Sequence, residues 1–134
     1  MVLDGRERAA LRIAPVIAHR SVLIVEAYTD SAESLQLLLE IHGHGCVVAK
    51  DGASALAAAG RQQFDAILVS IGLPDMDGYE VAQRLRSAGY LGMLIAITGY
   101  GRKSDLDRAA SNGFDHHLLK PFEFPDLERL LTRI

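Results

Sequence analysis

Five short apolar runs recur along the chain, and each is followed by a longer segment with the spacing of an amphipathic helix. The runs are unbroken and rich in β-branched residues, which is typical of strands buried on both faces of a parallel sheet. This alternation limits the possible folds more than any other feature, because parallel neighbours must be joined by crossovers. We predict strands over residues 22–25, 46–49, 66–69, 93–97 and 116–119.

The segments between these runs predict five helices. The first opens at Asp30 and Ser31, whose short polar side chains favour a helix start, and Gly43 ends it. The others are expected over residues 53–60, 79–88, 104–112 and 125–134. Strands that alternate with helices in this way form βαβ units. We therefore expect an α/β fold, a doubly wound five-stranded parallel sheet with helices on both faces.

The composition fits one domain and excludes several classes of function. The chain has 134 residues, of which 49% are hydrophobic and 23% are charged, and its formal net charge is -3. We expect a domain over residues 21–134, preceded by a linker or extension over residues 1–20. Without a basic stripe or a long apolar segment, we expect neither direct nucleic-acid binding nor membrane insertion. The single cysteine, Cys46, fits a reducing, cytoplasmic compartment.

Polar residues stand at or just beyond the ends of four predicted strands. In doubly wound folds, ligands bind outside the carboxyl ends of the strands, where the strand order reverses. Any functional site is therefore expected among four residues, Glu26, Ser70, Thr98 and Lys120.

Five short motifs surround these strand ends, namely VLIVE (22–26), DG (51–52), LPDMDGY (73–79), ITG (97–99) and LKPF (119–122). In order and spacing they resemble the response regulator receiver domain, the CheY-like family of two-component signalling. The resemblance covers residues 21–134, and the segment 113–121 is similar to receivers fused to hybrid histidine kinases. It implies a flavodoxin-like fold with the strand order 2-1-3-4-5.

The resemblance also implies a phosphorylation site, of which this chain keeps only a part. In the family, two adjacent acids and a third acid hold Mg²⁺, and the third accepts a phosphoryl group from a histidine kinase. The matching positions are Glu26, Ala27 and Ser70, so two of the three carboxylates are missing. Glu26 and Lys120 then balance each other in charge. We expect Mg²⁺ to bind weakly or not at all, through Glu26 and the carbonyl of Gly72.

Other parts of the family's machinery are matched. Thr98 and Lys120 occupy the positions that contact the phosphoryl group, and His117 occupies that of the switching aromatic residue. We expect a non-enzymatic interaction module that works without phosphorylation. Its implied partners are a histidine kinase, an output domain, another receiver, or a second copy of the chain in a homodimer. The implied binding face comprises residues 104–112, 116–119 and 125–134.

Three alternatives stay open. The chain could be phosphorylated on Ser70 or on a nearby acid such as Asp75 or Asp77, although we expect no general base beside Ser70. Ser70 could replace the aspartate of an ordinary receiver in this chain alone, although the second loss, at Ala27, favours natural decay. A flavodoxin-like binder of a small ligand is the weakest alternative, since no phosphate-holding glycine loop follows the first strand.

His42, His44 and Cys46 include metal-ligating residue types. They straddle a helix end and two glycines, and a structural zinc site needs four ligands. We interpret them as structural residues of a loop.

Overall fold

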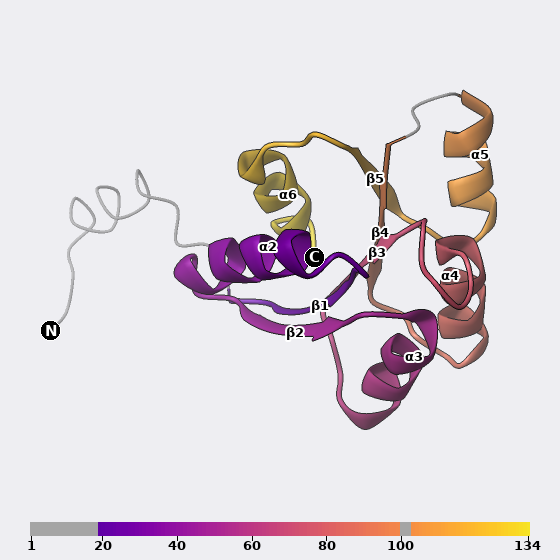
Figure 1. The fold of residues 1–134 in the computed structure, drawn as a ribbon, viewed down its shortest axis with the longest axis horizontal. Coiled ribbons are helices and arrows are strands. Elements are labelled where there is room, and N and C mark those ends of the chain that lie inside the picture. Colours follow the sequence, from indigo (N-terminus) through magenta and orange to yellow (C-terminus); the bar gives the residue numbers. More distant parts are fainter. Residues whose placement is uncertain (1–18, 100–102) are drawn as a thin grey trace, which may run out of the picture.

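A computed structural model describes residues 19–99 and 103–134 (Figure 1). Of the linker expected over residues 1–20, residues 1–18 lie outside this part of the chain. Within it, strands and helices alternate. The strands are β1 (Ser21–Val25), β2 (Gly45–Ala49), β3 (Ala66–Ser70), β4 (Met93–Thr98) and β5 (His116–Leu119). The helices are α2 (Thr29–Ile41), α3 (Gly52–Arg61), α4 (Gly78–Ser87), α5 (Lys103–Ser111) and α6 (Phe124–Leu131).

The strands form one parallel sheet in the order β2-β1-β3-β4-β5, which confirms the predicted fold. Helices cover both faces of the sheet (Figure 1). On one face α2 and α6 bury Leu39 and Leu127 against the strands. On the other face α3, α4 and α5 contribute Ala55, Leu85 and Ala109 to a second apolar core.

The central strands are apolar throughout because their side chains alternate between these two cores. In β1, Val22 and Ile24 enter the core beneath α2 and α6, whereas Leu23 and Val25 enter the core beneath α3, α4 and α5. All four side chains are fully buried. Burial of an aliphatic side chain of this size contributes roughly 1.5–3 kcal/mol to stability. The unbroken run in the sequence therefore reflects a strand that is covered on both sides.

Several predicted boundaries shift. β3 and β4 each extend by one residue, because Ser70 pairs with Ile97 and Thr98 pairs with Leu119 in the parallel ladder. α2 begins at Thr29, one residue before the predicted start, behind an N-cap, Tyr28, that makes no capping hydrogen bond through its side chain.

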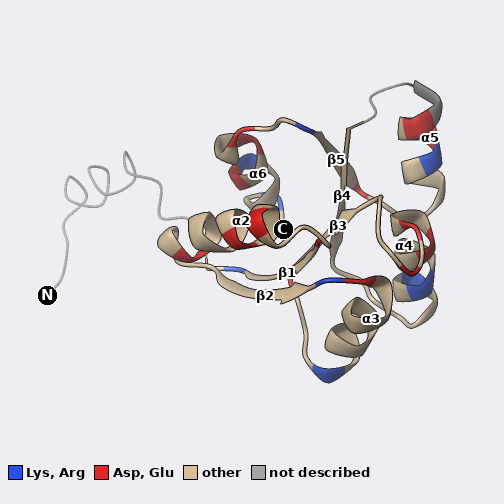
Figure 2. Cartoon of the chain, viewed as in Figure 1, with Lys and Arg blue, Asp and Glu red and all other residues tan. Residues whose placement is uncertain are grey.

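The last helix, α6, is shorter than the predicted range 125–134. It starts at Phe124, where the carboxylate of Asp126 accepts a hydrogen bond from the N–H of Glu123 at 3.3 Å. Beyond its end, the carbonyl of Ile134 accepts a hydrogen bond from Nη2 of Arg20 at 3.2 Å, so the last residue lies beside the start of β1. None of the helices in the described ranges is long and apolar enough to cross a membrane. Figure 2 shows acidic and basic residues interspersed on α4, α5 and α6.

Arg86 connects the end of α4 to the strands beside it. Its Nη1 donates to the carbonyls of Tyr90 and Gly92, at 2.9 and 2.8 Å. Its Nε donates to the carbonyl of Gly113 at 3.1 Å, and its Nη2 forms an ion pair with Asp115 at 2.9 Å. One guanidinium group thus holds together the segment before β4 and the segment before β5.

Replacing Arg86 with alanine is expected to lower the free energy of unfolding by ~2 kcal/mol, because three carbonyls and one carboxylate lose a charged donor. Urea denaturation of the purified chain measures the change. Arg84→Ala is the matched control, since Arg84 is exposed and makes one i,i+4 pair with Glu80, for which we expect a loss of about 0.5 kcal/mol or less. Equal losses in the two variants would contradict the role assigned to Arg86.

Candidate functional site

The four polar residues of the strand ends lie at the carboxyl edge of the sheet. Glu26 follows β1, Ser70 ends β3, Thr98 ends β4 and Lys120 follows β5. Glu26, Ser70 and Thr98 are buried, whereas the Lys120 side chain is 43% exposed. The site therefore has a buried floor of oxygen-bearing side chains and an ammonium group that reaches in from the surface.

The carboxylate of Glu26 is the centre of this site. Ser70 Oγ donates a hydrogen bond to Oε2, and Lys120 Nζ lies 3.5 Å from Oε1. The first contact follows from strand pairing, since Val25 of β1 lies opposite Val69 of β3 and Glu26 and Ser70 are the residues that follow this pair. Both oxygens of the carboxylate are therefore engaged within the domain.

One prediction about Ser70 is wrong. We expected no general base beside it, yet the carboxylate of Glu26 accepts the hydrogen bond of its hydroxyl. Glu26 was expected at the same edge of the sheet as Ser70, but as a metal ligand and the charge partner of Lys120 and not as a base; the pairing of β1 with β3 brings its carboxylate to the hydroxyl from 44 residues away. A hydroxyl that donates to a carboxylate is the arrangement from which a base can take a proton.

Three further positions carried over from the family, Thr98, Ala27 and Gly72, add no charged side chain to this edge of the sheet. The N–H of Lys120 donates to the carbonyl of Thr98 at 2.9 Å, which fixes β5 and β4 relative to each other. Ala27 is half-buried beside Glu26 and brings no oxygen in its side chain. Gly72 is exposed, and a Cβ placed on it would meet no heavy atom within 4 Å. Among these positions, Glu26 is thus the one carboxylate.

The loop after β3 returns close to the end of that strand. A Cβ on Gly78, the first residue of α4, would lie 2.7 Å from the carbonyl oxygen of Ser70 and 2.8 Å from Cα of Ile71. Contacts this short are not tolerated, so glycine is needed for α4 to begin here.

Asp75 and Asp77, the two other candidate phosphoryl acceptors, cap helices. The carboxylate of Asp75 accepts hydrogen bonds from the N–H groups of Gly52 and Ala53 at the start of α3, at 2.8 and 3.0 Å. These bonds, that of Gly52 first, hold the pKa of Asp75 below its usual value. The carboxylate of Asp77 accepts from the N–H of Glu80 at 2.9 Å as the N-cap of α4. Their contacts direct both carboxylates to helix N-termini.

His117, at the family's switch position, is exposed on β5 opposite Ala96 of β4. Its neighbour Leu118 is buried in the core beneath α2 and α6. Because successive side chains alternate across a strand, the imidazole of His117 lies on the other face of the sheet, the face that carries α5.

The three metal-ligating types near β2 do not converge. His44 is buried, its Nδ1 accepts from the N–H of Arg20 at 3.0 Å, and its Nε2 lies 3.1 Å from Oε1 of Glu128. Mainly through burial, the pKa of Cys46 is raised to about 12, so its thiol stays protonated at neutral pH. No group of three or more His, Cys, Asp or Glu residues in the described part of the chain could hold a metal ion. The partner of His44, on α6, is a residue that the sequence pattern did not reveal.

Comparisons with known proteins point to one family. A family model described as the response regulator receiver domain matches residues 22–132. Over 113 residues the chain is 34% identical to the response regulator MprA of Mycobacterium leprae. This alignment covers 84% of the chain and 48% of MprA. Over 111 residues it is 29% identical to the sensor histidine kinase RcsC of Escherichia coli K12. This alignment covers 83% of the chain and 12% of RcsC. The chain thus spans a part of the length of these two relatives.

Among solved structures, the chain is similar to the receiver domain of the sensor histidine kinase PA1611 from Pseudomonas aeruginosa PAO1. The two share 30% sequence identity with a TM-score of 0.79, and the match covers 87% of this chain and 97% of that one. That structure has a magnesium ion coordinated in its active site cleft. The fold, the motifs at the strand ends and the family match together show that this chain belongs to the response regulator receiver domains of two-component signalling.

Proposed function

We propose that this receiver domain is an atypical one, a non-enzymatic module that signals through protein contacts without accepting a phosphoryl group. The burial and the contacts of Glu26 are the main support for this proposal. Its carboxylate is buried, and its two oxygens are taken by the hydroxyl of Ser70 and the ammonium of Lys120. At the position of the family's phosphoryl acceptor stands a hydroxyl, which has no charge at neutral pH. The site is therefore already satisfied without an incoming group.

The donor set does not suit Mg²⁺. This ion prefers six oxygen ligands in near-octahedral geometry, and carboxylate charge offsets the cost of removing its water. Ala27 and Ser70 bring no charge, and Lys120 already offsets the charge of Glu26. To bind here, the ion would have to displace both partners of that carboxylate. We propose that the domain has no resident metal.

Titration with MgCl₂ tests this point. We expect the amide NMR shifts of Glu26, Ser70 and Gly72 to drift without saturating at millimolar Mg²⁺, because one balanced carboxylate attracts a dication weakly. A binding curve that saturates in this range, with shifts confined to these residues, would contradict the proposal.

The proposed partners bind on the face formed by α5, β5 and α6. Leu119 is 42% exposed there, and His117, two residues before it on β5, is also exposed. We propose a histidine kinase, an output domain, another receiver or a second copy of this chain as the partner, and the cytoplasm as the compartment. The family supports this choice, because MprA is a response regulator and RcsC is a sensor histidine kinase.

The contact between Ser70 and Glu26 favours a second candidate function, in which Ser70 itself accepts a phosphoryl group. Ser70 Oγ would attack the phosphorus of an acyl phosphate, its proton would pass to Glu26, and the carboxylate of the acyl group would leave as the old P–O bond breaks. Lys120 would then face the new phosphate group. The product would be a phosphoserine, which is stable in acid, rather than an acyl phosphate.

Incubation with acetyl phosphate and MgCl₂ distinguishes the two candidates. The main proposal predicts that the mass of the intact protein stays unchanged, because Ser70 is held by a carboxylate that has already been paired with Lys120. The matched control is Ser70→Ala. An acid-stable gain of one phosphoryl group in the unaltered chain, absent from Ser70→Ala, would establish the second candidate instead.

Restoring the missing acids should restore the family's chemistry. The double change Ala27→Asp with Ser70→Asp places two carboxylates beside Glu26. The net charge summed over these three positions and Lys120 then falls from zero to -2. The variant should bind Mg²⁺ and accept phosphate from acetyl phosphate. Without metal its carboxylates repel one another, so it should be less stable in chelator, and Mg²⁺ at 100 times its Kd should return about 2.7 kcal/mol. Thermal melts with and without the ion measure this difference.

Ser70→Asp alone is the control for the double variant. It should gain less stability from Mg²⁺, because one ligand fewer carries charge. If the double variant neither gains metal-dependent stability nor becomes phosphorylated, the strand ends do not have the geometry of a working receiver, and the assignment of Ser70 to the acceptor position is wrong.

A further inference from the structure

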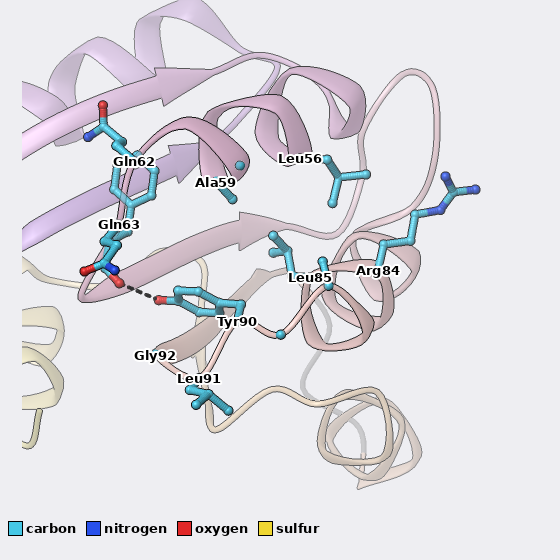
Figure 3. Close-up of a pocket in the computed structure, with 13 residues that line it drawn as sticks. Leu56, Ala59, Gln62, Gln63, Arg84, Leu85, Tyr90, Leu91 and Gly92 are labelled. Carbon is cyan, nitrogen blue, oxygen red and sulfur yellow. Dashed lines mark hydrogen bonds between the residues drawn. The ribbon is translucent and has the colours of Figure 1, made fainter.

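A pocket of about 660 Å³ opens at the end of the sheet where β3 and β4 begin, opposite the end that carries Glu26 and Ser70. Figure 3 shows the residues that line it. The pocket lies between α3 and α4, beside the segments that lead into β3 and β4. Leu56 and Ala59 line it from α3, Leu85 lines it from α4, and Phe64 and Tyr90 line it from the connecting segments. The volume falls within the range of roughly 300–1,000 Å³ that is usual for sites of small molecules.

Tyr90 gives this pocket an aromatic wall. Its hydroxyl lies 3.2 Å from the carbonyl oxygens of both Phe64 and Met93, and its one hydrogen is donated to one or the other, which holds the ring in place. Arg86 lies over the ring, with Cζ 5.6 Å from the centroid. Burial is the main reason why the pKa of Tyr90 lies above its usual value, so the ring stays uncharged at neutral pH. The lining of the pocket therefore includes a fixed, neutral aromatic ring that a second aromatic ring can contact.

No unpaired charge points into the pocket from the residues that line it. Arg84 is the one charged residue among them, its Nη2 lies 3.4 Å from Oε1 of Glu80, and Figure 3 shows its side chain pointing away from Tyr90. Gln62 and Gln63 lie along one edge and carry amides that can donate and accept. At the rim, Leu91 is 94% exposed, so a ligand seated here would cover apolar surface that now faces water.

We propose that this pocket binds a small, uncharged aromatic molecule. Apolar walls and a fixed ring favour a flat apolar body, and the glutamine amides suit one or two neutral polar groups on it. A charged ligand would lose its water without gaining an opposite charge. Ligand binding at this pocket goes beyond the function proposed above and does not require it, because binding is measured without phosphate or metal; the coupling to the partner face described next does rest on that function.

Arg86 links the pocket to the proposed partner-binding face formed by α5, β5 and α6. The guanidinium group that binds the carbonyls of Tyr90 and Gly92, at the wall of the pocket, also binds the carbonyl of Gly113 and the carboxylate of Asp115. Gly113 and Asp115 lie between α5 and β5. A ligand that shifts Tyr90 would therefore act on Arg86 and, through it, on the segment between two elements of the proposed partner surface.

Indole serves as the probe, and indole-3-acetate and tryptamine are matched probes with the same ring and opposite charges. Titration of the full chain, followed by amide NMR shifts, should show saturable indole binding with a Kd on the order of 1 mM. Shifts should centre on Leu56, Leu85 and Tyr90. Both charged probes should bind about tenfold more weakly. Shifts that do not saturate, or a charged probe that binds as tightly as indole, would overturn the proposal.

Leu56→Gln places an amide in the apolar wall and should weaken indole binding about tenfold. Leu37→Gln, the same change on the exposed face of α2, should leave it unaltered. Equal effects in the two variants would refute the location of the site.

The coupling through Arg86 has its own readout in the same titration. Bound indole should also shift the amides of Gly113 and Asp115, and these shifts should shrink in Arg86→Lys, which keeps the charge but loses the planar fork of donors. If that variant does not fold, the unaltered chain decides the matter. Saturable binding that leaves both amides unmoved would overturn the coupling.

Discussion

The parallel pairing of β1 with β3 is the constraint on which the site depends. It places Glu26 opposite Ser70, and a slip of one residue would turn every side chain of a strand to the other face. A buried carboxylate must find partners, because its charge has lost most of its water. The sheet supplies one partner from β3 and, beyond β5, the ammonium of Lys120. Folding alone therefore completes the network.

Charge balance separates this domain from a receiver with three acids. Three carboxylates in one pocket repel one another until a cation or a chemical change relieves them, and this stored repulsion makes such a pocket responsive. Here the single negative charge of Glu26 already has a positive partner. Lys120 is also held by its backbone, through the hydrogen bond to the carbonyl of Thr98. Under the function proposed above, the strand ends that respond to an input in a three-acid pocket serve here as fixed contacts within the fold.

Local patterns in the sequence predicted most of the fold and little of the site's connectivity. The apolar runs over residues 22–25 and 66–69 correspond to β1 and β3, and the resemblance to receivers supplied the strand order. The predicted strand stops at residue 69, whereas the pairing of Ser70 with Ile97 keeps Ser70 in β3. The bond from Ser70 to Glu26 and the contact of His44 with Glu128 join residues 44 and 84 positions apart. Such contacts follow from strand register and helix placement, which composition and periodicity do not encode.

The contacts around Arg20 have a mechanical consequence. Its side chain bonds to the carbonyl of Ile134, and its N–H bonds to His44, which contacts Glu128 on α6. The first strand and the last helix are thus fastened to each other at one corner of the domain. Segments attached before β1 and after Ile134 would leave from neighbouring points, so the domain could sit within a loop of a larger protein without forcing that loop apart. Tension between such flanks would act first on the contacts of Arg20 with Ile134 and His44.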